Sequence, residues 1–110
     1  SNLVSKYFYL TPKNSPFMLF TSKVKSKAIP AVTHVDKSSR IQTVDKNTQP
    51  LFKILKSFQK NTGLGVLMNT SFNGPGEPIV ETTSQALKKY LSSNIDHLLI
   101  ENFIITKNAK

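Results

Sequence analysis

The stretch from Leu67 to Val80 reads LMNTSFNGPGEPIV and holds two glycines and two prolines within five residues. Gly74 and Gly76 can take backbone conformations that are closed to other residues, while Pro75 and Pro78 stiffen the chain between them. An apolar approach precedes them. The stretch therefore predicts a loop that follows a buried strand.

Short polar side chains gather directly before the first glycine of this loop. Asn69, Thr70, Ser71 and Asn73 supply hydrogen-bond donors and acceptors without bulk. Such clusters, when glycines follow, let backbone and hydroxyl groups approach a phosphate or a planar carbonyl group closely. The same residue types commonly do no more than satisfy the backbone of their own turn. The residues alone leave both interpretations open.

The size and composition of the chain indicate one soluble globular domain. A chain of 110 residues can bury roughly two thirds of the surface of the unfolded chain. The absence of cysteine excludes disulfides and thiolate metal sites. No segment approaches the roughly 20 apolar residues of a membrane span, and the first ten residues lack the pattern of a signal peptide. We therefore expect a cytoplasmic chain with no membrane partner.

The net charge of +9 is carried by the first half of the chain. Residues 1–60 hold eleven Lys or Arg and two Asp or Glu, whereas residues 61–110 hold four of each kind. A basic field of this kind suits phosphorylated ligands, nucleic acid or an acidic partner. It equally suits a solvated lysine-rich surface, because fourteen of the fifteen cations are Lys.

The apolar and turn patterns predict an α+β fold with the element order β β β α β α β β. Apolar residues at helical spacing, with Gly63 after them, predict the first helix. Thr82 and Gln85 form a capping-box pattern at the start of the second. The expected helices span about 50–61 and 82–94, and the expected strands are 17–24, 32–35, 40–44, 66–69, 98–100 and 103–105.

Several segments carry longer motifs. NTSFNGPGEPIV is followed by TSQAL and by NIDHLLIENFIITK, and the chain reads PFMLFTSKV and IPAVTHVDKSSRIQTV upstream. Together these segments resemble the C-terminal region of the O-carbamoyltransferases of nodulation and antibiotic tailoring. That family's patterns are approximately N-T-S-F-N-x-x-G-E-P-I-V and I-P-A-V-T-H-V-D-G-T-A-R-V-Q-T-V. The resemblance covers nearly the whole chain from Ser15 to Lys107.

The resemblance implies a fold and a chemistry. The implied fold is that of the threonylcarbamoyl-AMP synthases, called YrdC-like, with a mixed twisted sheet and helices. Thr70, Ser71 and Asn73 fall on the T-S-x-N signature that helps hold the nucleotide in that fold. The implied site joins carbamoyl phosphate with ATP, accompanied by Mg²⁺, to give a carbamoyl-adenylate. A separate metal-containing domain of the ASKHA type would then carbamoylate an acceptor hydroxyl, and neither that metal nor its ligands is expected in this chain.

The chain also departs from the family pattern. Lys37 stands where the family usually has Gly, and Ser38 and Ser39 replace Thr-Ala. The basic K-x-R-E-x-F-R-P-F segment that family members carry upstream is missing. We therefore expect residues 1–110 to be an incomplete YrdC-like domain, the C-terminal portion of a larger enzyme. We expect the remainder of that enzyme as a partner, self-association through an exposed sheet edge, and no turnover by the isolated chain.

Two residues are the candidate catalytic groups. Arg40 falls on the Arg of the family's A-R-V-Q-T-V, where its planar fork could bind two phosphate oxygens. Alternatively, Arg40 pairs on the surface with Asp36 or Asp45. Ser71, together with Asn69, would donate to phosphate or carbamoyl oxygens.

Other candidates keep two interpretations. Asn73 either contacts the ligand or only shapes the turn before Gly74. His34 could move protons beside Asp36, or it could be a packed, hydrogen-bonded residue. Glu77 could bind a metal on the nucleotide, or it could hold backbone amides.

A binding module is the alternative to an enzyme. Lys53, Lys56 and Lys60 form a basic stripe on the first predicted helix. In this alternative a basic α/β domain contacts RNA or an acidic protein, and the NTSFN loop is scaffolding. Without interleaved Arg and aromatic residues, we expect nucleic-acid binding to be weak at most.

Overall fold

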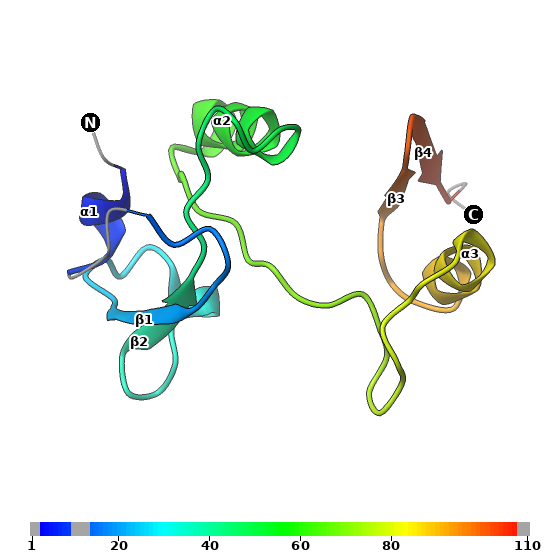
Figure 1. The fold of residues 1–110 in the computed structure, drawn as a ribbon, viewed down its shortest axis with the longest axis horizontal. Helices are drawn as coiled ribbons and strands as arrows, with labels where there is room; N and C mark the ends of the chain where they lie inside the picture. The colour runs from blue at the N-terminus through cyan, green and yellow to red at the C-terminus, as the bar shows by residue number, and fades with distance from the viewer. Residues whose placement is uncertain (1–2, 10–13, 108–110) are drawn as a thin grey trace. The chain divides into compact units, whose positions relative to one another are not determined.

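The computed structural model describes residues 3–9 and 14–107 and divides the chain into two compact units. Unit 1 runs from Ser1 to Met68, and unit 2 runs from Asn69 to Lys110. Each unit combines helix with a pair of strands (Figure 1), which confirms the predicted α+β class. The family resemblance implies a mixed twisted sheet, whereas the strands of the described residues pair as two two-stranded antiparallel sheets.

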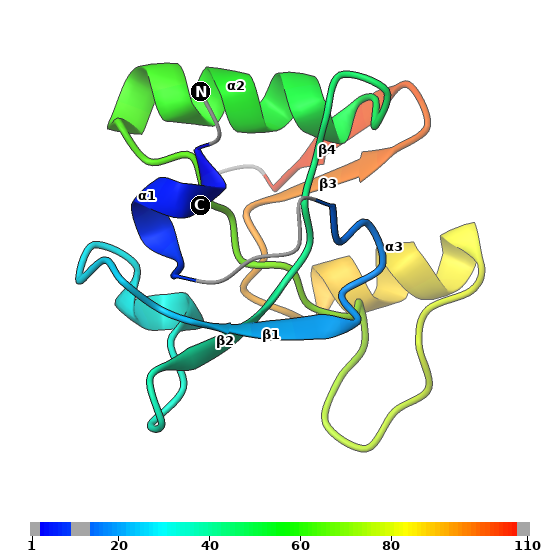
Figure 2. The same ribbon diagram turned by 60° about the vertical axis from the view of Figure 1, so that its left-hand side comes forward.

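The sheet of unit 1 consists of β1 (Phe20–Lys23) and β2 (Ser38–Ile41), which lie side by side in Figure 2. Ile41 lies opposite Phe20 and is buried in the core of the unit. Ser15 continues this packing, because its hydroxyl donates to the Ile41 carbonyl at 3.1 Å. The buried core residues of unit 1 are Tyr7, Phe8, Ile29 and Ile41.

A short helix that the sequence did not predict, α1 (Val4–Tyr7), brings Tyr7 into this core. The Tyr7 side chain is 1% exposed, and its hydroxyl accepts a hydrogen bond from the Gly65 amide at 2.9 Å. The bond connects residues 58 positions apart in the chain. The start of unit 1 is thereby held to the segment that follows α2.

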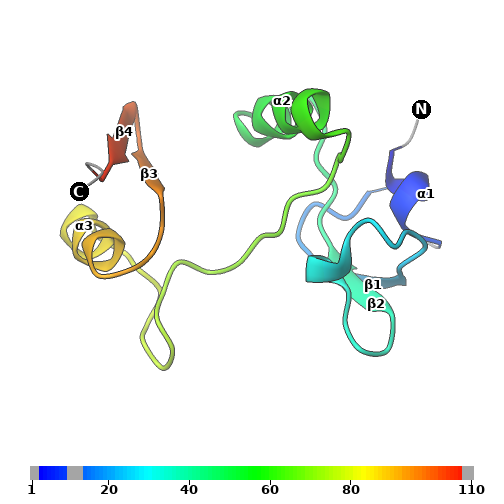
Figure 3. The same cartoon turned by 180° about the vertical axis from the view of Figure 1, so that it is seen from behind.

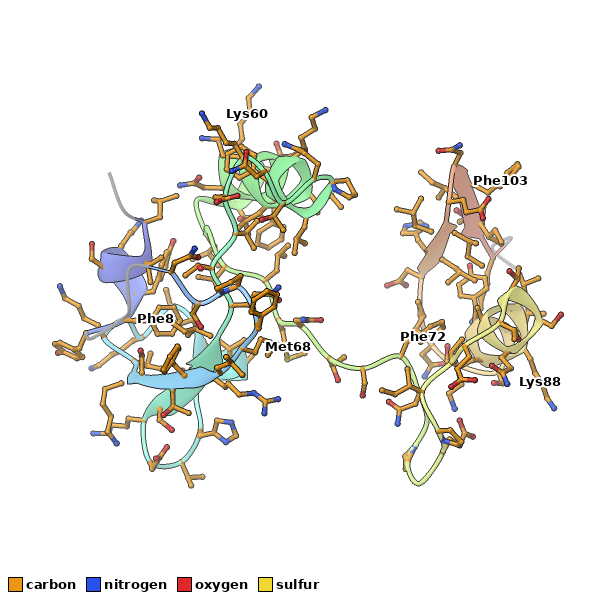
Figure 4. The ribbon with its side chains drawn as sticks, viewed as in Figure 1. Phe8, Lys60, Met68, Phe72, Lys88 and Phe103 are labelled. Carbon is orange, nitrogen blue, oxygen red and sulfur yellow. The ribbon has the colours of Figure 1, made fainter. Side chains whose placement is uncertain are left out.

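The helix α2 (Leu51–Thr62) confirms the prediction for residues 50–61. Gly63 ends it with a left-handed φ of +76°, a conformation that glycine adopts at little cost. Leu51, Leu55 and Phe58 are half-buried on its apolar side. Its lysines at 53, 56 and 60 are exposed, and Lys60 extends away from the helix in Figure 4.

Unit 2 consists of α3 (Thr83–Leu91) and the hairpin of β3 (His97–Ile100) and β4 (Phe103–Thr106), as seen in Figure 3. Both halves of the predicted capping box are present: the Thr82 hydroxyl accepts from the Gln85 amide, and the Gln85 side chain accepts from the Thr82 amide. Ala86, Tyr90 and Leu98 form the buried core of the unit. The predicted second helix and C-terminal hairpin are confirmed.

Two predicted strands are wrong. Residues 32–35 form no strand. Val32 ends a single 3₁₀ turn, η1 (Pro30–Val32), and His34 begins a tight turn in which the Lys37 amide donates to the His34 carbonyl at 2.9 Å. Val35 lies in that turn and is fully exposed, so its apolar side chain is not buried as the strand prediction required. Over 66–69, Val66 packs on the core of unit 1, but residues 67–69 are exposed and join no strand of the described residues.

Within the described residues, no helix has the length and apolar character needed to cross a membrane.

Candidate functional site

The loop of residues 72–80 in unit 2 is closed by backbone hydrogen bonds. The Val80 amide donates to the Phe72 carbonyl at 2.9 Å, and the Glu77 amide donates to the Gly74 carbonyl at 3.1 Å. Phe72, labelled in Figure 4, is half-buried against the core of unit 2. Gly76 has a φ of +71°, which L side chains rarely adopt. The loop is thus a folded structure at the edge of the unit 2 core.

Glu77 is an exposed residue whose carboxylate bonds back to the loop and to α3. Its Oε2 atom accepts hydrogen bonds from the Gly74 amide at 3.0 Å and from Lys89 Nζ at 2.6 Å. The Lys89 ammonium, and after it the Gly74 amide, lowers the pKa of the Glu77 carboxyl below its ordinary value. The geometry therefore matches the interpretation in which Glu77 holds a backbone amide, and it connects the loop to α3 through Lys89.

Gly74 lies in close contact with the Glu77–Lys89 ion pair. A Cβ atom at position 74 would collide with Lys89 Nζ and would lie 2.5 Å from the Glu77 carboxylate oxygen. These atoms are the far ends of two flexible side chains, so a side chain at position 74 would displace the Glu77–Lys89 ion pair. The Glu77–Lys89 ion pair and Gly74 are therefore one structural element.

Asn73 and Ser71 are brought together in this loop. Asn73 Nδ2 donates to the Glu77 carbonyl at 3.0 Å and to the Gly74 carbonyl at 3.3 Å. Asn73 Oδ1 accepts from the Ser71 hydroxyl at 2.5 Å. Asn73 is half-buried, whereas Ser71 is exposed. Asn73 thus shapes the turn, and Ser71 presents its hydroxyl at the surface.

Asn69 and Thr70 precede these residues at the start of unit 2, and both are exposed. The T-S-x-N segment therefore offers surface groups from Thr70 and Ser71, followed by the structural amide of Asn73. Phosphate and carbonyl groups of a ligand are recognised by polar groups of this kind.

Arg40 and His34 belong to unit 1. Arg40 is an exposed residue of β2, opposite Thr21 of β1. His34 is also exposed, so the interpretation as a packed residue is wrong. Its backbone amide donates to the Ser38 carbonyl at 2.9 Å, which places it at the start of the turn that leads into β2.

The two carboxylates considered as partners of Arg40 are engaged elsewhere. Asp36 Oδ1 accepts from the Ser38 hydroxyl at 2.6 Å and from the Ser38 amide at 2.9 Å, and these bonds lower the pKa of Asp36. Asp45 accepts from the amide of Asn47 at 2.8 Å. Across the described part of the chain, neither forms an ion pair with Arg40.

Lys89 is the contact that sequence reasoning missed. Twelve residues separate it from Glu77, and no local spacing rule connects a helix residue with a loop at that distance. In residues 3–9 and 14–107, no group of three or more His, Cys, Asp or Glu side chains is arranged to hold a metal ion.

Comparison with known proteins identifies the family. The sequence matches the family described as carbamoyltransferase C-terminus over residues 1–107. The chain belongs to this family. The family resemblance predicted from the sequence motifs is confirmed.

The proteins similar to this chain include both named and uncharacterised ones. Nodulation protein NolO of Bradyrhizobium diazoefficiens is 38% identical over 109 residues, covering 94% of this chain and 20% of NolO. The 3'-hydroxymethylcephem-O-carbamoyltransferase of Amycolatopsis lactamdurans is 37% identical over 87 residues, covering 77% of this chain and 17% of that enzyme. Uncharacterized protein sll1178 of Synechocystis is 42% identical over 103 residues, covering 92% of this chain and 17% of that protein. The chain thus spans a fifth or less of each of these relatives.

Proposed function

We propose that the chain is the C-terminal portion of a longer O-carbamoyltransferase and that it binds ATP and carbamoyl phosphate to form a carbamoyl-adenylate. The observation that carries the proposal is the family match over residues 1–107. The name of the Amycolatopsis relative, a 3'-hydroxymethylcephem-O-carbamoyltransferase, supports transfer of a carbamoyl group to a hydroxyl oxygen.

The proposed reaction consumes carbamoyl phosphate, ATP and water, and releases inorganic phosphate and pyrophosphate. The carbamoyl-adenylate that remains has a good leaving group, AMP, on the carbamoyl carbon. A hydroxyl oxygen of an acceptor then forms a bond to that carbon as its proton is released to solvent, and the bond from the carbon to AMP breaks. We assign the second step to a separate ASKHA-type domain of the longer protein, and we assign the YrdC-like fold to the domain of which this chain is a part.

Each candidate residue has a role in this proposal. Arg40, which forms no ion pair with Asp36 or Asp45, binds phosphate oxygens with its planar fork. Asn69, Thr70 and Ser71 supply the exposed polar groups that contact the ligand. Asn73 holds the turn beneath them. Glu77 is already bound by Gly74 and Lys89, so we do not assign it to Mg²⁺.

The test measures pyrophosphate release from ATP with carbamoyl phosphate, using the protein at its natural length. Arg40→Lys keeps the charge but loses the two-pronged geometry, so the rate should fall on the order of 10-fold. Lys27→Gln, which removes an exposed charge elsewhere in unit 1, is the control. Carbamoylation from preformed adenylate should be unchanged in Arg40→Lys. An absence of pyrophosphate release in the unmodified protein would refute the proposed function.

A further inference from the structure

The orientation of the Asn73 side-chain amide is fixed by chemistry. Its two neighbours on one side are the carbonyl oxygens of Glu77 and Gly74, at 3.0 and 3.3 Å. A carbonyl oxygen only accepts hydrogen bonds, so the Asn73 nitrogen must face these two oxygens. Asn73 Oδ1, which only accepts, must then face Ser71.

This orientation determines how the Ser71 hydroxyl is used. Ser71 Oγ lies 2.5 Å from Asn73 Oδ1, at the short end of the range for such bonds, and it donates its proton there. A hydroxyl has one proton and two acceptor lone pairs. The exposed side of Ser71 therefore offers lone pairs, and a ligand would have to break a short internal bond in order to receive its proton.

Contacts within the loop and to α3 hold Asn73 in place. Glu77, whose carbonyl accepts from Asn73, is itself held through its carboxylate by the Gly74 amide and by Lys89 of α3. These contacts all lie within unit 2. The loop itself thus holds Ser71 in the orientation in which its lone pairs face outward.

We propose that Ser71 accepts a hydrogen bond from the amino group of the carbamoyl moiety and thereby distinguishes carbamoyl phosphate from acyl phosphates. The proposal rests on the proposed function, which supplies the carbamoyl ligand. The carbamoyl NH₂ group donates hydrogen bonds, whereas the methyl group of acetyl phosphate has a similar size and donates none. An acceptor at Ser71 therefore favours carbamoyl phosphate. Beside the methyl group of acetyl phosphate, the Ser71 oxygen would have no hydrogen-bond donor from the ligand.

The experiment compares these two ligands in the protein at its natural length. The KM for carbamoyl phosphate and the inhibition constant of acetyl phosphate are measured by pyrophosphate release. Ser71→Ala should raise the KM for carbamoyl phosphate about 10-fold, the effect of one neutral hydrogen bond, and should leave the acetyl phosphate constant within about 2-fold of its original value. Ser71→Thr keeps the hydroxyl and should keep the discrimination.

Ser84→Ala is the matched control, because it removes a hydroxyl from an exposed residue of α3 in the same unit. Equal losses for both phosphates in Ser71→Ala, or no loss for either, would overturn the inference while turnover in the unmodified protein left the proposed function intact. If the unmodified protein showed no turnover with ATP and carbamoyl phosphate, the proposed function would fail and the inference with it.

Discussion

The ammonium of Lys107 lies 4.8 Å from the centre of the Tyr90 ring and donates a hydrogen bond to the Ser93 carbonyl just beyond α3. Tyr90 is fully buried, and its hydroxyl donates to the Asp96 carbonyl at 3.0 Å. A cation at a helix C-terminus and above an aromatic face is doubly favoured. The residue that follows β4 therefore holds the end of α3 in place.

Lys107→Met should destabilise unit 2, since it removes both the charge above the ring and the donor to Ser93. We expect a loss of about 1 kcal/mol in the free energy of unfolding. Urea unfolding followed by the near-ultraviolet signal of the chain measures it. Lys88→Met, on an exposed position of α3, is the matched control, and an equal loss in both variants would contradict the assignment.

Tyr7→Phe should destabilise unit 1 by about 1 to 3 kcal/mol, because the Gly65 amide loses its acceptor in a part-buried position. Hydrogen exchange at the Gly65 amide should accelerate at the same time. Tyr9→Phe is the control, since Tyr9 is 65% exposed. Unchanged exchange at Gly65 in Tyr7→Phe would show that the bond does not hold this segment.

Acid should loosen the loop of residues 72–80. The pKa of Glu77 is lowered by Lys89 and the Gly74 amide, so the carboxylate stabilises the folded loop above its ordinary pKa of 4.5. As the pH falls below that value through the folded pKa, protonation removes this contribution. The Gly74 amide resonance should shift in that window. Glu77→Gln should abolish the shift, and a titration that persists in this variant would assign it to another group.

Nucleic-acid binding should be weak and sensitive to salt. The exposed lysines at 53, 56 and 60 form a basic stripe on α2. Binding of a labelled single-stranded RNA, followed by fluorescence anisotropy, should fade between about 50 and 200 mM salt. Lys56→Gln should reduce the logarithmic salt slope by about 1, whereas Lys107→Gln should not change it. Tight, sequence-selective binding at high salt would instead favour the binding-module alternative.

We expect the chain to self-associate through the exposed apolar side chains on one face of its C-terminal hairpin. Leu99 and Ile104 lie opposite each other on β3 and β4 and are 56% and 73% exposed. Light scattering over a range of concentrations should show a rising mean mass, and replacing both residues by Thr should reduce it. Ile79→Thr removes an apolar residue that is 61% exposed outside the strands and serves as the control. A constant monomer mass in the unmodified chain would count against this prediction.

Local signals account for the elements that the sequence predicted correctly. The apolar periodicity of α2 and the capping box of Thr82 and Gln85 each lie within a few residues of the structure they determine. The wrong strands depended on pairing, which local residue types do not encode. Val35 has a β-branched side chain, which favours a strand, but it pairs with no strand of the described residues and lies exposed in a turn.

In the candidate site, too, the sequence predicted the local features but not the contacts between residues that are distant in the chain. The polar residues at 69–73 and the glycines after them were visible as a pattern, because they are adjacent in the sequence. The contacts that orient them were not. Lys89 reaches Glu77 across twelve residues, and the direction of the Ser71 hydrogen bond depends on which atoms of Asn73 face the neighbouring carbonyls.

The two glycines of the loop should respond differently to a saturation-mutagenesis screen. A Cβ atom at position 76 would meet nothing within 4 Å, so the constraint there is the backbone angle, and Asn or Asp should be the best tolerated replacements. Gly74 is constrained by the space that Lys89 and Glu77 occupy, so every replacement should be penalised. That penalty should shrink when Lys89 is also shortened to Ala, which makes positions 74 and 89 an epistatic pair.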